Sequence, residues 1–323
     1  MAKREGHRYF DKEFKIEAVR LMNEEGKMKN FLIAVLVIIV ALVACYYAFP
    51  EKVAGYVMDA ARSKAGLTKK EIKIDDHNIV YLDGGKGPTI LLLHGYTGSK
   101  DNWIMLAPYL TKNYHVVIPD IPGYGESSMI EKDSHDLSNQ MSRLHKFVQA
   151  LELKKFHIAG NSMGGLFAGT YAVRYPDEII SVGLFDAAGV TSSEKSLVFK
   201  MAEKGENPLL LKDSNDVPRW VALVCFKEPS LPYPIKKVMI KTALANRQFY
   251  EKERKEFAPD LYSLEKDLPK IKAPTLILWG DQDKVIDVSS VPVFEKGLIN
   301  HKTVIIKDGG HVPMMEKPQE TAT

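Results

Sequence analysis

The sequence predicts an α/β fold in which a mostly parallel sheet is covered by helices on both faces and carries a helical insertion. Strand-like and helix-like stretches alternate from about residue 89 to residue 187, which is the pattern of βαβ units. Runs such as Thr89–Leu93 are almost wholly apolar, as in strands that are buried on both faces. The alternation stops after Ala187 and resumes at Thr275–Trp279. The residues between these points therefore form an insertion.

Length and composition fit one sizeable domain with an appendage, since the chain has 323 residues and 45% of them are hydrophobic. The net charge is only +3 and the acids and bases are interspersed, which does not indicate a nucleic-acid-binding surface. The two cysteines, Cys45 and Cys225, are far apart and predict no disulfide framework. No Cys/His spacing resembles a zinc site. We expect no nucleic-acid partner, no metal and no cofactor.

A run of 19 residues without a charge, Phe31–Phe49, predicts a membrane-spanning helix. As a helix it spans about 28 Å, close to the hydrocarbon thickness of a bilayer. A buried core helix of this length normally carries a polar face, and this run has none. Lys27 and Lys29 precede the run and favour a cytoplasmic N-terminus, with the rest of the chain exported to the periplasmic or extracellular side in a bacterium.

The same run leaves a second interpretation open. Leu42–Cys45 resembles a bacterial lipobox, in which the chain is cut before the cysteine and lipidated there. Tyr46, Tyr47 and Phe49 continue the apolar run and form an aromatic cluster of the kind found at membrane interfaces. This continuation favours an uncleaved anchor over the lipoprotein.

The first 27 residues form a foreign N-terminal extension that reads as one short amphipathic helix. The stretch Arg8–Leu21 resembles the opening of insertion-element transposase subunits, where it begins a helix-turn-helix. Only the first of those helices is present here, so DNA binding is not predicted. Met28 is the more natural beginning of the protein.

The remaining chain divides by pattern into an α/β core and its attachments. Expected core elements are a β-hairpin at 71–82, strands at 89–93, 114–118, 156–161, 180–185, 275–279 and 303–306, and helices at 101–110, 137–151 and 166–175. The expected domain boundaries are 1–27 for the extension, 28–50 for the anchor or signal segment, 51–70 for an amphipathic juxtamembrane helix, 71–189 and 269–323 for the α/β core, and 190–268 for a helical cap.

The predicted insertion, 190–268, is helix-like, broken by prolines and rich in apolar side chains. Inserted at this point of a parallel sheet, it would lie over the carboxyl ends of the strands, where sites form. Trp220, Phe226 and Leu231 are the candidate lining of a substrate pocket that suits an acyl chain. An ordinary helical subdomain without a substrate role is the alternative.

The run Gly-Asn-Ser-Met-Gly-Gly at 160–165 contains the pattern Gly-x-Ser-x-Gly between a strand-like and a helix-like stretch. In that context the serine occupies a strained turn that exposes its hydroxyl above the sheet. The two outer glycines let the strand and the helix approach closely. Ser162 is therefore the candidate nucleophile, although an ordinary capping serine at a glycine-rich helix start would share the pattern.

A serine hydroxyl needs an imidazole to take its proton and a carboxylate to orient that imidazole. In this type of fold the acid precedes the histidine, and both follow the serine. His311 follows the last predicted strand, whereas His301 precedes it, so His311 is the predicted base. After the strand at 275–279 we choose Asp283 over Asp281, which is expected to hydrogen-bond within the turn.

Four further residues belong to or support the candidate site. Asp186, after the preceding strand, is a weaker candidate for the acid. The N–H groups of Met163, at the start of the helix, and of Tyr96, after the strand at 89–93, are the predicted oxyanion donors. His94, beside Tyr96, is expected to support the packing of that loop.

With these residues placed, the sequence resembles the α/β-hydrolases over about residues 45–320. It is most similar to membrane-anchored monoacylglycerol lipases of the α/β-hydrolase-domain group and to related cold-adapted bacterial lipases. The resemblance rests on the stretches 94–96, 100–103, 160–165, 207–210, 279–288 and 310–316. It implies hydrolysis of acylglycerols or other carboxylic esters through an acyl-serine intermediate without a cofactor, by Ser162, Asp283 and His311. Members of the family normally continue past residue 318 with a final helix, of which at most the first turn is expected here.

These observations predict a membrane-anchored serine hydrolase that acts on monoacylglycerols or medium-chain acyl esters. A general short-chain esterase and a C–C bond hydrolase of aromatic degradation remain alternatives. The membrane anchor counts against the C–C hydrolase, because the substrates of those enzymes are water-soluble acids. A catalytically silent binding protein is a further alternative, against which the complete set of three residues counts.

Overall fold

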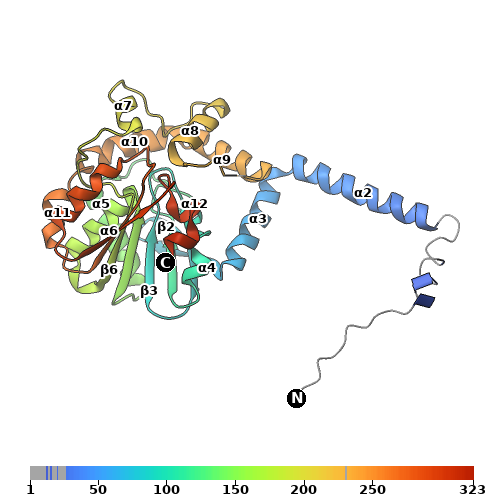
Figure 1. Ribbon diagram of the computed structural model, residues 1–323, viewed down its shortest axis with the longest axis horizontal. Coiled ribbons are helices and arrows are strands. Elements are labelled where there is room, and N and C mark those ends of the chain that lie inside the picture. Colours follow the sequence, from blue (N-terminus) through green and yellow to red (C-terminus); the bar gives the residue numbers. More distant parts are fainter. Residues whose placement is uncertain (1–11, 14, 17–19, 21–26, 230) are drawn as a thin grey trace, which may run out of the picture.

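The computed structural model describes residues 12–13, 15–16, 20, 27–229 and 231–323. The helix predicted for residues 1–27, and with it the transposase resemblance, falls almost entirely outside these residues. Within them the chain forms an α/β core, a group of helices above it, and one long helix that projects away from it (Figure 1).

The core is an eight-stranded sheet in the order β1-β2-β4-β3-β5-β6-β7-β8. β2 pairs antiparallel with β1 and β4, and every other neighbouring pair is parallel. This arrangement confirms the predicted fold class. The strands are β1 Leu67–Ile74, β2 His77–Gly85, β3 Thr89–Leu93, β4 His115–Pro119, β5 Phe156–Asn161, β6 Ile179–Phe185, β7 Thr275–Gly280 and β8 His301–Ile306.

Helices cover both faces of the sheet, which explains the unbroken apolar strands. Leu91 and Leu93 of β3 join the core that contains α5 and α6, whereas Leu92 joins the core on the other face. Alternate side chains of one strand thus enter opposite cores. The helices of the α/β core are α4 Ala107–Leu110, α5 Leu137–Ala150, α6 Met163–Arg174, α11 Val291–Gly297, α12 Pro313–Glu316 and α13 Pro318–Thr321, with the 3₁₀ turns η1 Lys100–Trp103, η2 Pro176–Glu178 and η6 Val288–Ser290.

Two local elements differ from the sequence expectation. The predicted helix at 101–110 is broken into η1 and α4, because Ser99 caps η1 and Pro108 begins a new turn in α4. The first hairpin starts earlier than predicted, since Leu67 already pairs with Gly84. Residues 67–70, expected in the juxtamembrane helix, are therefore part of β1.

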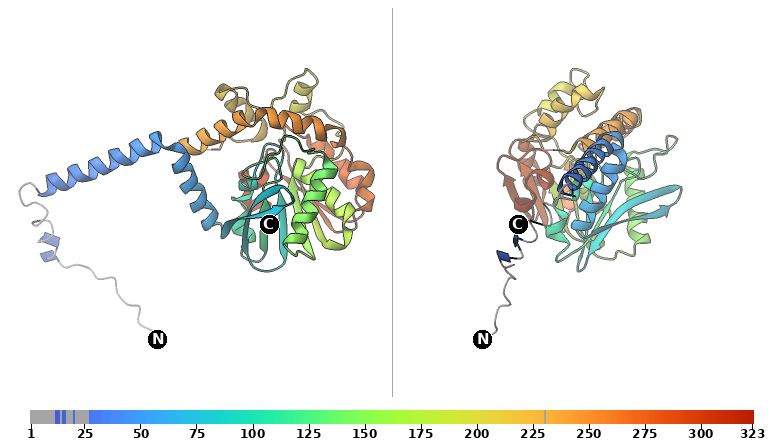
Figure 2. Two further views of the ribbon diagram at one scale, coloured as in Figure 1. Left: turned by 180° about the vertical axis from the view of Figure 1, so that it is seen from behind. Right: turned by 90° about the vertical axis from the view of Figure 1, so that its right-hand side faces the viewer.

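The insertion between β6 and β7 is helical and lies above the sheet (Figures 1 and 2). Its helices contact the loops that follow the core strands: Tyr96 Oη, after β3, donates to the Tyr250 carbonyl at 2.6 Å, and His311 N–H, after β8, donates to the Val224 carbonyl at 2.9 Å. It therefore adjoins the strand ends where the candidate site was predicted. The elements are α7 Leu197–Ala202, η3 Ser214–Asp216, α8 Val217–Val224, α9 Tyr233–Ala245, α10 Arg247–Phe257, η4 Ala258–Asp260 and η5 Glu265–Lys270.

The projecting helix, α2 Lys27–Ala48, contains the stretch Asn30–Ala48, which has a mean hydropathy of 2.9 and is not buried. It is long and apolar enough to cross a bilayer, a property that signal sequences share. The next helix, α3 Pro50–Lys64, turns back toward the core (Figure 1). Arg62 of α3 is buried and donates to both carboxylate oxygens of Asp101, at 2.9 and 2.6 Å. This bidentate ion pair attaches α3 to the core.

Candidate active site

Ser162 occupies the tight turn between β5 and α6. Its backbone has φ 57° and ψ −121°, a conformation that costs energy for a residue with a side chain. A Cβ on Gly160 would lie 1.9 Å from the carbonyl oxygen of Gly164, so the turn requires glycine there. Ser162 N–H donates to the Phe185 carbonyl at 3.0 Å, and the Ser162 carbonyl accepts from Ala188 N–H at 3.0 Å. These bonds to the neighbouring strand end hold the strained residue in place.

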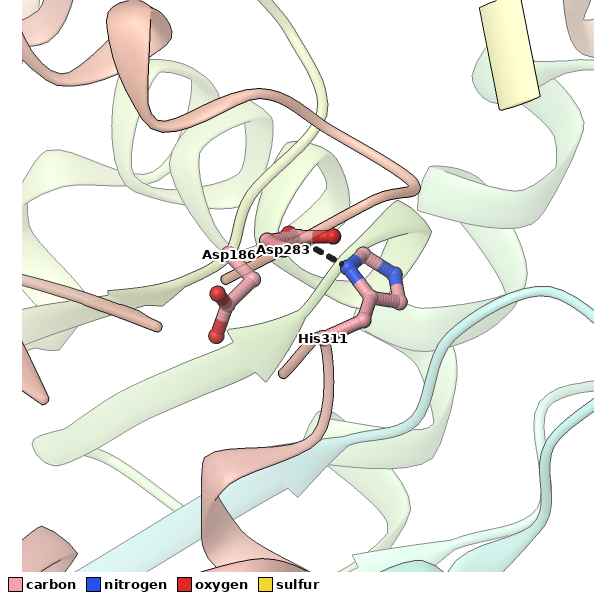
Figure 3. Close-up of side chains that lie close together, drawn as sticks. All are labelled: Asp186, Asp283 and His311. Carbon is pink, nitrogen blue, oxygen red and sulfur yellow. Dashed lines mark hydrogen bonds and ion pairs between the residues drawn. The ribbon is translucent and has the colours of Figure 1, made fainter. Parts of the chain in front are cut away.

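His311 and Asp283 lie together beyond the ends of β8 and β7. His311 Nδ1 is 2.7 Å from Asp283 Oδ2 (Figure 3), and both side chains are buried. The other Asp283 oxygen accepts from Val285 N–H at 2.7 Å and Ile286 N–H at 3.1 Å. Because these N–H groups fix the carboxylate, Oδ2 is left to orient the imidazole.

Asp281, the alternative acid, does not make the turn contact expected of it. Its Oδ1 is buried without a hydrogen-bond partner among the described residues. Asp283 caps the turn with one oxygen and meets His311 with the other. The choice of Asp283 over Asp281 therefore agrees with the geometry, and its catalytic role stays a prediction.

Asn161 links the serine turn to the histidine loop. Its Nδ2 donates to the carbonyl of His311 at 2.9 Å and to that of Phe185 at 3.1 Å. The residue immediately before Ser162 thus holds the backbone of His311. Sequence reasoning missed this contact, because nothing in the pattern Gly-x-Ser-x-Gly specifies what the second residue touches.

Glu316 joins the histidine loop to the insertion. Its Oε1 accepts from Gly310 N–H at 3.0 Å, and its Oε2 accepts from Phe226 N–H at 2.8 Å and Lys227 N–H at 3.2 Å. Burial raises the pKa of the Glu316 carboxyl, although the three N–H groups stabilise its anion and oppose this shift. In the sequence, Glu316 is the last residue of the stretch 310–316 that carries the family resemblance, and no role was predicted for it.

The loop after β3 approaches Ser162 from the other side. A Cβ on Gly95 would lie 3.0 Å from the Ser162 Cβ. His94 is buried and supports the turn, with Nε2 accepting from Ile121 N–H at 3.0 Å and Nδ1 lying 2.9 Å from the Gly95 carbonyl. Burial lowers the pKa of His94, so the ring is neutral. The N–H groups of Tyr96 and Met163 have no hydrogen-bond partner in the described part of the chain, as oxyanion donors require.

The three predicted pocket residues are not equivalent. Trp220 is half-buried and packs against the hydrophobic core on one face of the sheet. Leu231 is also half-buried, whereas Phe226 is 46% exposed. The Phe226 side chain is therefore exposed. A substrate pocket formed by these three side chains stays a prediction.

Asp186 is a second carboxyl beside the acid. It is fully buried at the end of β6, and Figure 3 shows its carboxyl next to Asp283 and directed away from the imidazole. Oδ1 accepts from Gly280 N–H at 2.9 Å, and Oδ2 has no partner among the described residues. Burial, followed by the charge of Asp283, raises the pKa of Asp186 well above its usual value. Asp186 is therefore the neutral member of this pair.

Ligand atoms of Asp186, Asp283 and His311 lie within 4.8 Å of one another, close enough to hold a metal ion. His311 Nδ1, however, is already engaged by Asp283 at 2.7 Å. The hydrogen bond between His311 and Asp283, with the neutral Asp186 carboxyl beside it, accounts for the same grouping, and we assign it that way.

Replacing Asp186 by asparagine tests its neutral state. In the unfolded chain an aspartate ionises near pH 3.9, whereas folded Asp186 keeps its proton, so stability falls as pH rises from that value toward the folded pKa. We expect Asp186→Asn to raise the melting temperature at pH 8, and the gain to vanish near pH 4. Each unit of pKa shift corresponds to about 1.4 kcal/mol, or roughly 2–3 °C in a chain of 323 residues.

Thermal unfolding of the two proteins in detergent across this pH range measures the difference. Asp186→Ala, which removes the partner of Gly280 N–H, serves as the control and should lower the melting temperature at both pH values. A loss of stability in Asp186→Asn that grows toward pH 8 would show that Asp186 is ionised.

Comparison with known proteins fits this geometry. The family model for the alpha/beta hydrolase fold matches residues 88–216 and 232–318, most of the chain. The chain belongs to the α/β-hydrolase family. The gap in the match, 217–231, falls within the insertion, on α8 and the segment before α9.

Similar proteins in the family are lipases. The chain is 31% identical over 298 residues to monoacylglycerol lipase ABHD6 of Bos taurus, covering 88% of each chain. It is 34% identical over 271 residues to Lipase 1 of Psychrobacter immobilis, covering 82% of this chain and 85% of that one. The crystal structure of a bacterial membrane phospholipase A superposes with a TM-score of 0.84 at 40% identity, covering 91% and 96% of the two chains. These likenesses support an ester hydrolase that associates with a membrane.

The C–C bond hydrolases resemble the chain more distantly. The 2-hydroxy-6-oxo-6-phenylhexa-2,4-dienoate hydrolase of a Rhodococcus strain superposes with a TM-score of 0.69 but is 21% identical, over 79% of this chain and 95% of that one. That likeness shows the fold alone. The transposase resemblance of residues 1–27 finds no support in any of these matches.

Proposed function

We propose that this chain is a membrane-anchored serine hydrolase that cleaves carboxylic esters through an acyl-serine intermediate. Ser162 is the nucleophile, His311 the base, and Asp283 the acid that orients the imidazole. One observation carries the proposal: the 2.7 Å contact of His311 with Asp283 lies beside the strained Ser162, since Asn161 Nδ2 holds the His311 carbonyl at 2.9 Å. An oriented imidazole beside a strained serine is the arrangement that a serine nucleophile requires.

The reaction proceeds in two transfers. Ser162 Oγ attacks the ester carbonyl while His311 Nε2 takes its proton, and a tetrahedral oxyanion forms. The oxyanion collapses, the alcohol leaves with the proton from His311, and the acyl group remains on Ser162. Water then attacks the acyl-serine with the same help from His311, which releases the carboxylic acid and regenerates the serine.

The N–H groups of Tyr96 and Met163 stabilise the oxyanion in both steps. Both lie next to Ser162 in space, one in the loop whose Gly95 approaches the Ser162 Cβ and the other at the first position of α6. Loss of one such donor typically raises the barrier by about 3 kcal/mol. Because the donors are backbone groups, changes of the Tyr96 or Met163 side chain test these roles poorly.

Monoacylglycerols or medium-chain acyl esters are the proposed substrates. Its similarity to a monoacylglycerol lipase and to a bacterial lipase supports an acylglycerol substrate. The apolar helix α2 would keep the site near amphiphilic esters that leave a bilayer. We further propose that the N-terminus is cytoplasmic and the α/β core exported. An uncleaved anchor is favoured over a lipoprotein at Cys45, because α2 continues through Cys45 to Ala48.

Hydrolysis of p-nitrophenyl esters from two to sixteen carbons by the full chain in detergent tests the substrate class. We expect a maximum at medium chain lengths and turnover of monoacylglycerol that exceeds turnover of triacylglycerol. Activity on two-carbon esters alone would replace the lipase with a short-chain esterase. A folded sample with no ester turnover, but with hydrolysis of a vinylogous diketone acid, would assign the chain to the C–C hydrolases.

A further inference from the structure

The insertion touches the membrane-spanning helix. α9 begins beside the end of α2, where Tyr233 N–H donates to the Tyr46 hydroxyl at 3.1 Å. The Tyr233 ring centroid lies 6.1 Å from that of Tyr46 and 5.1 Å from that of Tyr47. Figures 1 and 2 show the start of α9 at the corner between α2 and α3. A helix inserted between β6 and β7 thus meets the anchor directly.

A second contact fixes the direction of α9 relative to the anchor. α3 packs along α9, and Lys241 Nζ lies 2.5 Å from Glu51 Oε1. Tyr233 and Lys241 are two turns apart on α9, so the helix is attached near its start and again farther along. The depth of α9 with respect to a bilayer therefore follows from the depth of α2.

The length of the apolar run sets that depth. Phe31–Phe49 spans about 28 Å as a helix, and the hydrocarbon layer is about 30 Å thick. When the run is centred in the bilayer, Tyr46 and Tyr47 lie about 5 Å inside the edge of the hydrocarbon layer, so that a tyrosine side chain reaches the headgroup boundary, where tyrosine is enriched. Tyr233 contacts both rings and lies at the same level. One turn farther along, Lys236 and Lys237 are then in the headgroup layer.

The side chains around this corner suit that layer. Phe49 and Tyr233 are 54% and 39% exposed. Lys237 Nζ lies 3.2 Å from the Tyr233 hydroxyl, which places an ammonium group beside an interfacial aromatic ring. We call the set Phe49, Lys52, Tyr233, Lys236 and Lys237 the junction surface.

The junction surface is basic. None of its three lysines has an ion pair with a carboxylate of the described residues, where Lys241 holds Glu51, and Glu228 is the one acid within the stretch 226–241. Lysines within a Debye length of about 8–10 Å of an anionic membrane surface are attracted to it. The aromatic and basic side chains thus complement lipid headgroups that carry negative charge.

We propose that the junction surface binds the headgroups of an anionic bilayer, in the leaflet from which α2 emerges. The membrane then holds the insertion as well as the anchor. This contact is a few residues from Val224, Phe226 and Lys227, which bond to the loop of His311 and to Glu316. The proposed membrane contact concerns the position of the insertion, and it does not depend on the proposed catalytic mechanism.

Depth-dependent quenching of tryptophan fluorescence tests the contact. The full chain carrying Tyr233→Trp is reconstituted in phosphatidylcholine vesicles with and without phosphatidylglycerol, with lipids brominated near the headgroup end of the chains. The signal is taken as the difference from the unsubstituted protein, which has three tryptophans of its own. We expect the added tryptophan to lose at least about half of its fluorescence, and to lose more when the anionic lipid is present.

Ile299→Trp is the matched control, because Ile299 is 77% exposed between α11 and β8. Figure 1 shows α11 on the side of the core opposite to α2. Its fluorescence should be unchanged in every vesicle. If tryptophan at position 233 is quenched no more than tryptophan at position 299, the insertion does not contact lipid and the proposal is overturned.

The charge of the surface is tested by Lys236→Gln/Lys237→Gln in the Tyr233→Trp background. We expect this pair to abolish the extra quenching by phosphatidylglycerol. Lys154→Gln/Lys155→Gln is the control pair, since these adjacent exposed lysines precede β5 at the opposite end of the sheet. Equal quenching with and without the anionic lipid, or loss of the difference in both pairs alike, would overturn the preference for anionic headgroups.

Discussion

Ser162→Ala is expected to lower ester turnover by about 10⁵- to 10⁶-fold in kcat, the loss seen when a serine nucleophile is removed from a complete triad. Alanine keeps the Cβ and therefore the backbone strain of the turn, so the fold should survive. Ser162 is held by its backbone bonds to Phe185 and Ala188, and these do not involve the hydroxyl. The rate on the best p-nitrophenyl ester and labelling by a fluorophosphonate probe measure the effect together.

The matched control is Ser193→Ala, which removes an exposed hydroxyl in the insertion. It should retain both turnover and labelling. Melting temperatures of the three proteins show whether any loss reflects unfolding. If Ser162→Ala is folded and keeps wild-type turnover, Ser162 is not the nucleophile and the proposed mechanism fails.

Asp283→Asn is expected to cost about 10³- to 10⁴-fold in kcat. Asparagine keeps the size of the side chain, and its carbonyl can still accept from Val285 N–H. Its amide group, however, would face His311 Nδ1, where the carboxylate now lies at 2.7 Å. The imidazole would take the wrong tautomer for removing the serine proton. Steady-state rates over pH 6–9 measure the loss.

Asp281→Asn is the paired control, because Asp281 lies in the same loop and its Oδ1 has no described partner. It should remain within a few-fold of the unchanged protein. If Asp281→Asn loses more activity than Asp283→Asn, Asp281 is the acid that orients His311. Near-equal, small losses would instead point to Asp186 as the group that supports His311.

Much of the candidate site could be predicted because its signals are local. The spacing of Gly160 and Gly164 predicts the strained turn at Ser162. Apolar residues such as Ile158 and Leu278 indicate the strands that lead to the site. Parallel strands bring their carboxyl ends to one edge, so residues that follow different strands could be grouped without coordinates. The membrane anchor could be predicted equally well, because a run of 19 uncharged residues is typical of a membrane-spanning helix.

The helix predicted at 101–110 was wrong for a local reason as well. Ser99 caps a 3₁₀ turn rather than a long helix, and Pro108 starts a separate one. The early start of β1 has a different cause. Residues 67–70 carry two lysines and show little strand pattern, and only their pairing with β2 makes them a strand.

The sequence by itself determined the fold class, the membrane-spanning run and the identity of the three candidate catalytic residues, because each depends on short-range pattern or on chain order. Only the tertiary structure decided that Asn161 holds His311, that Glu316 joins the insertion to the histidine loop, that Asp186 stays neutral beside Asp283, and that α9 meets the anchor. Each of these joins residues whose separation in the chain ranges from six to almost two hundred. Contacts of that kind depend on how the elements pack, and no periodicity or motif encodes them.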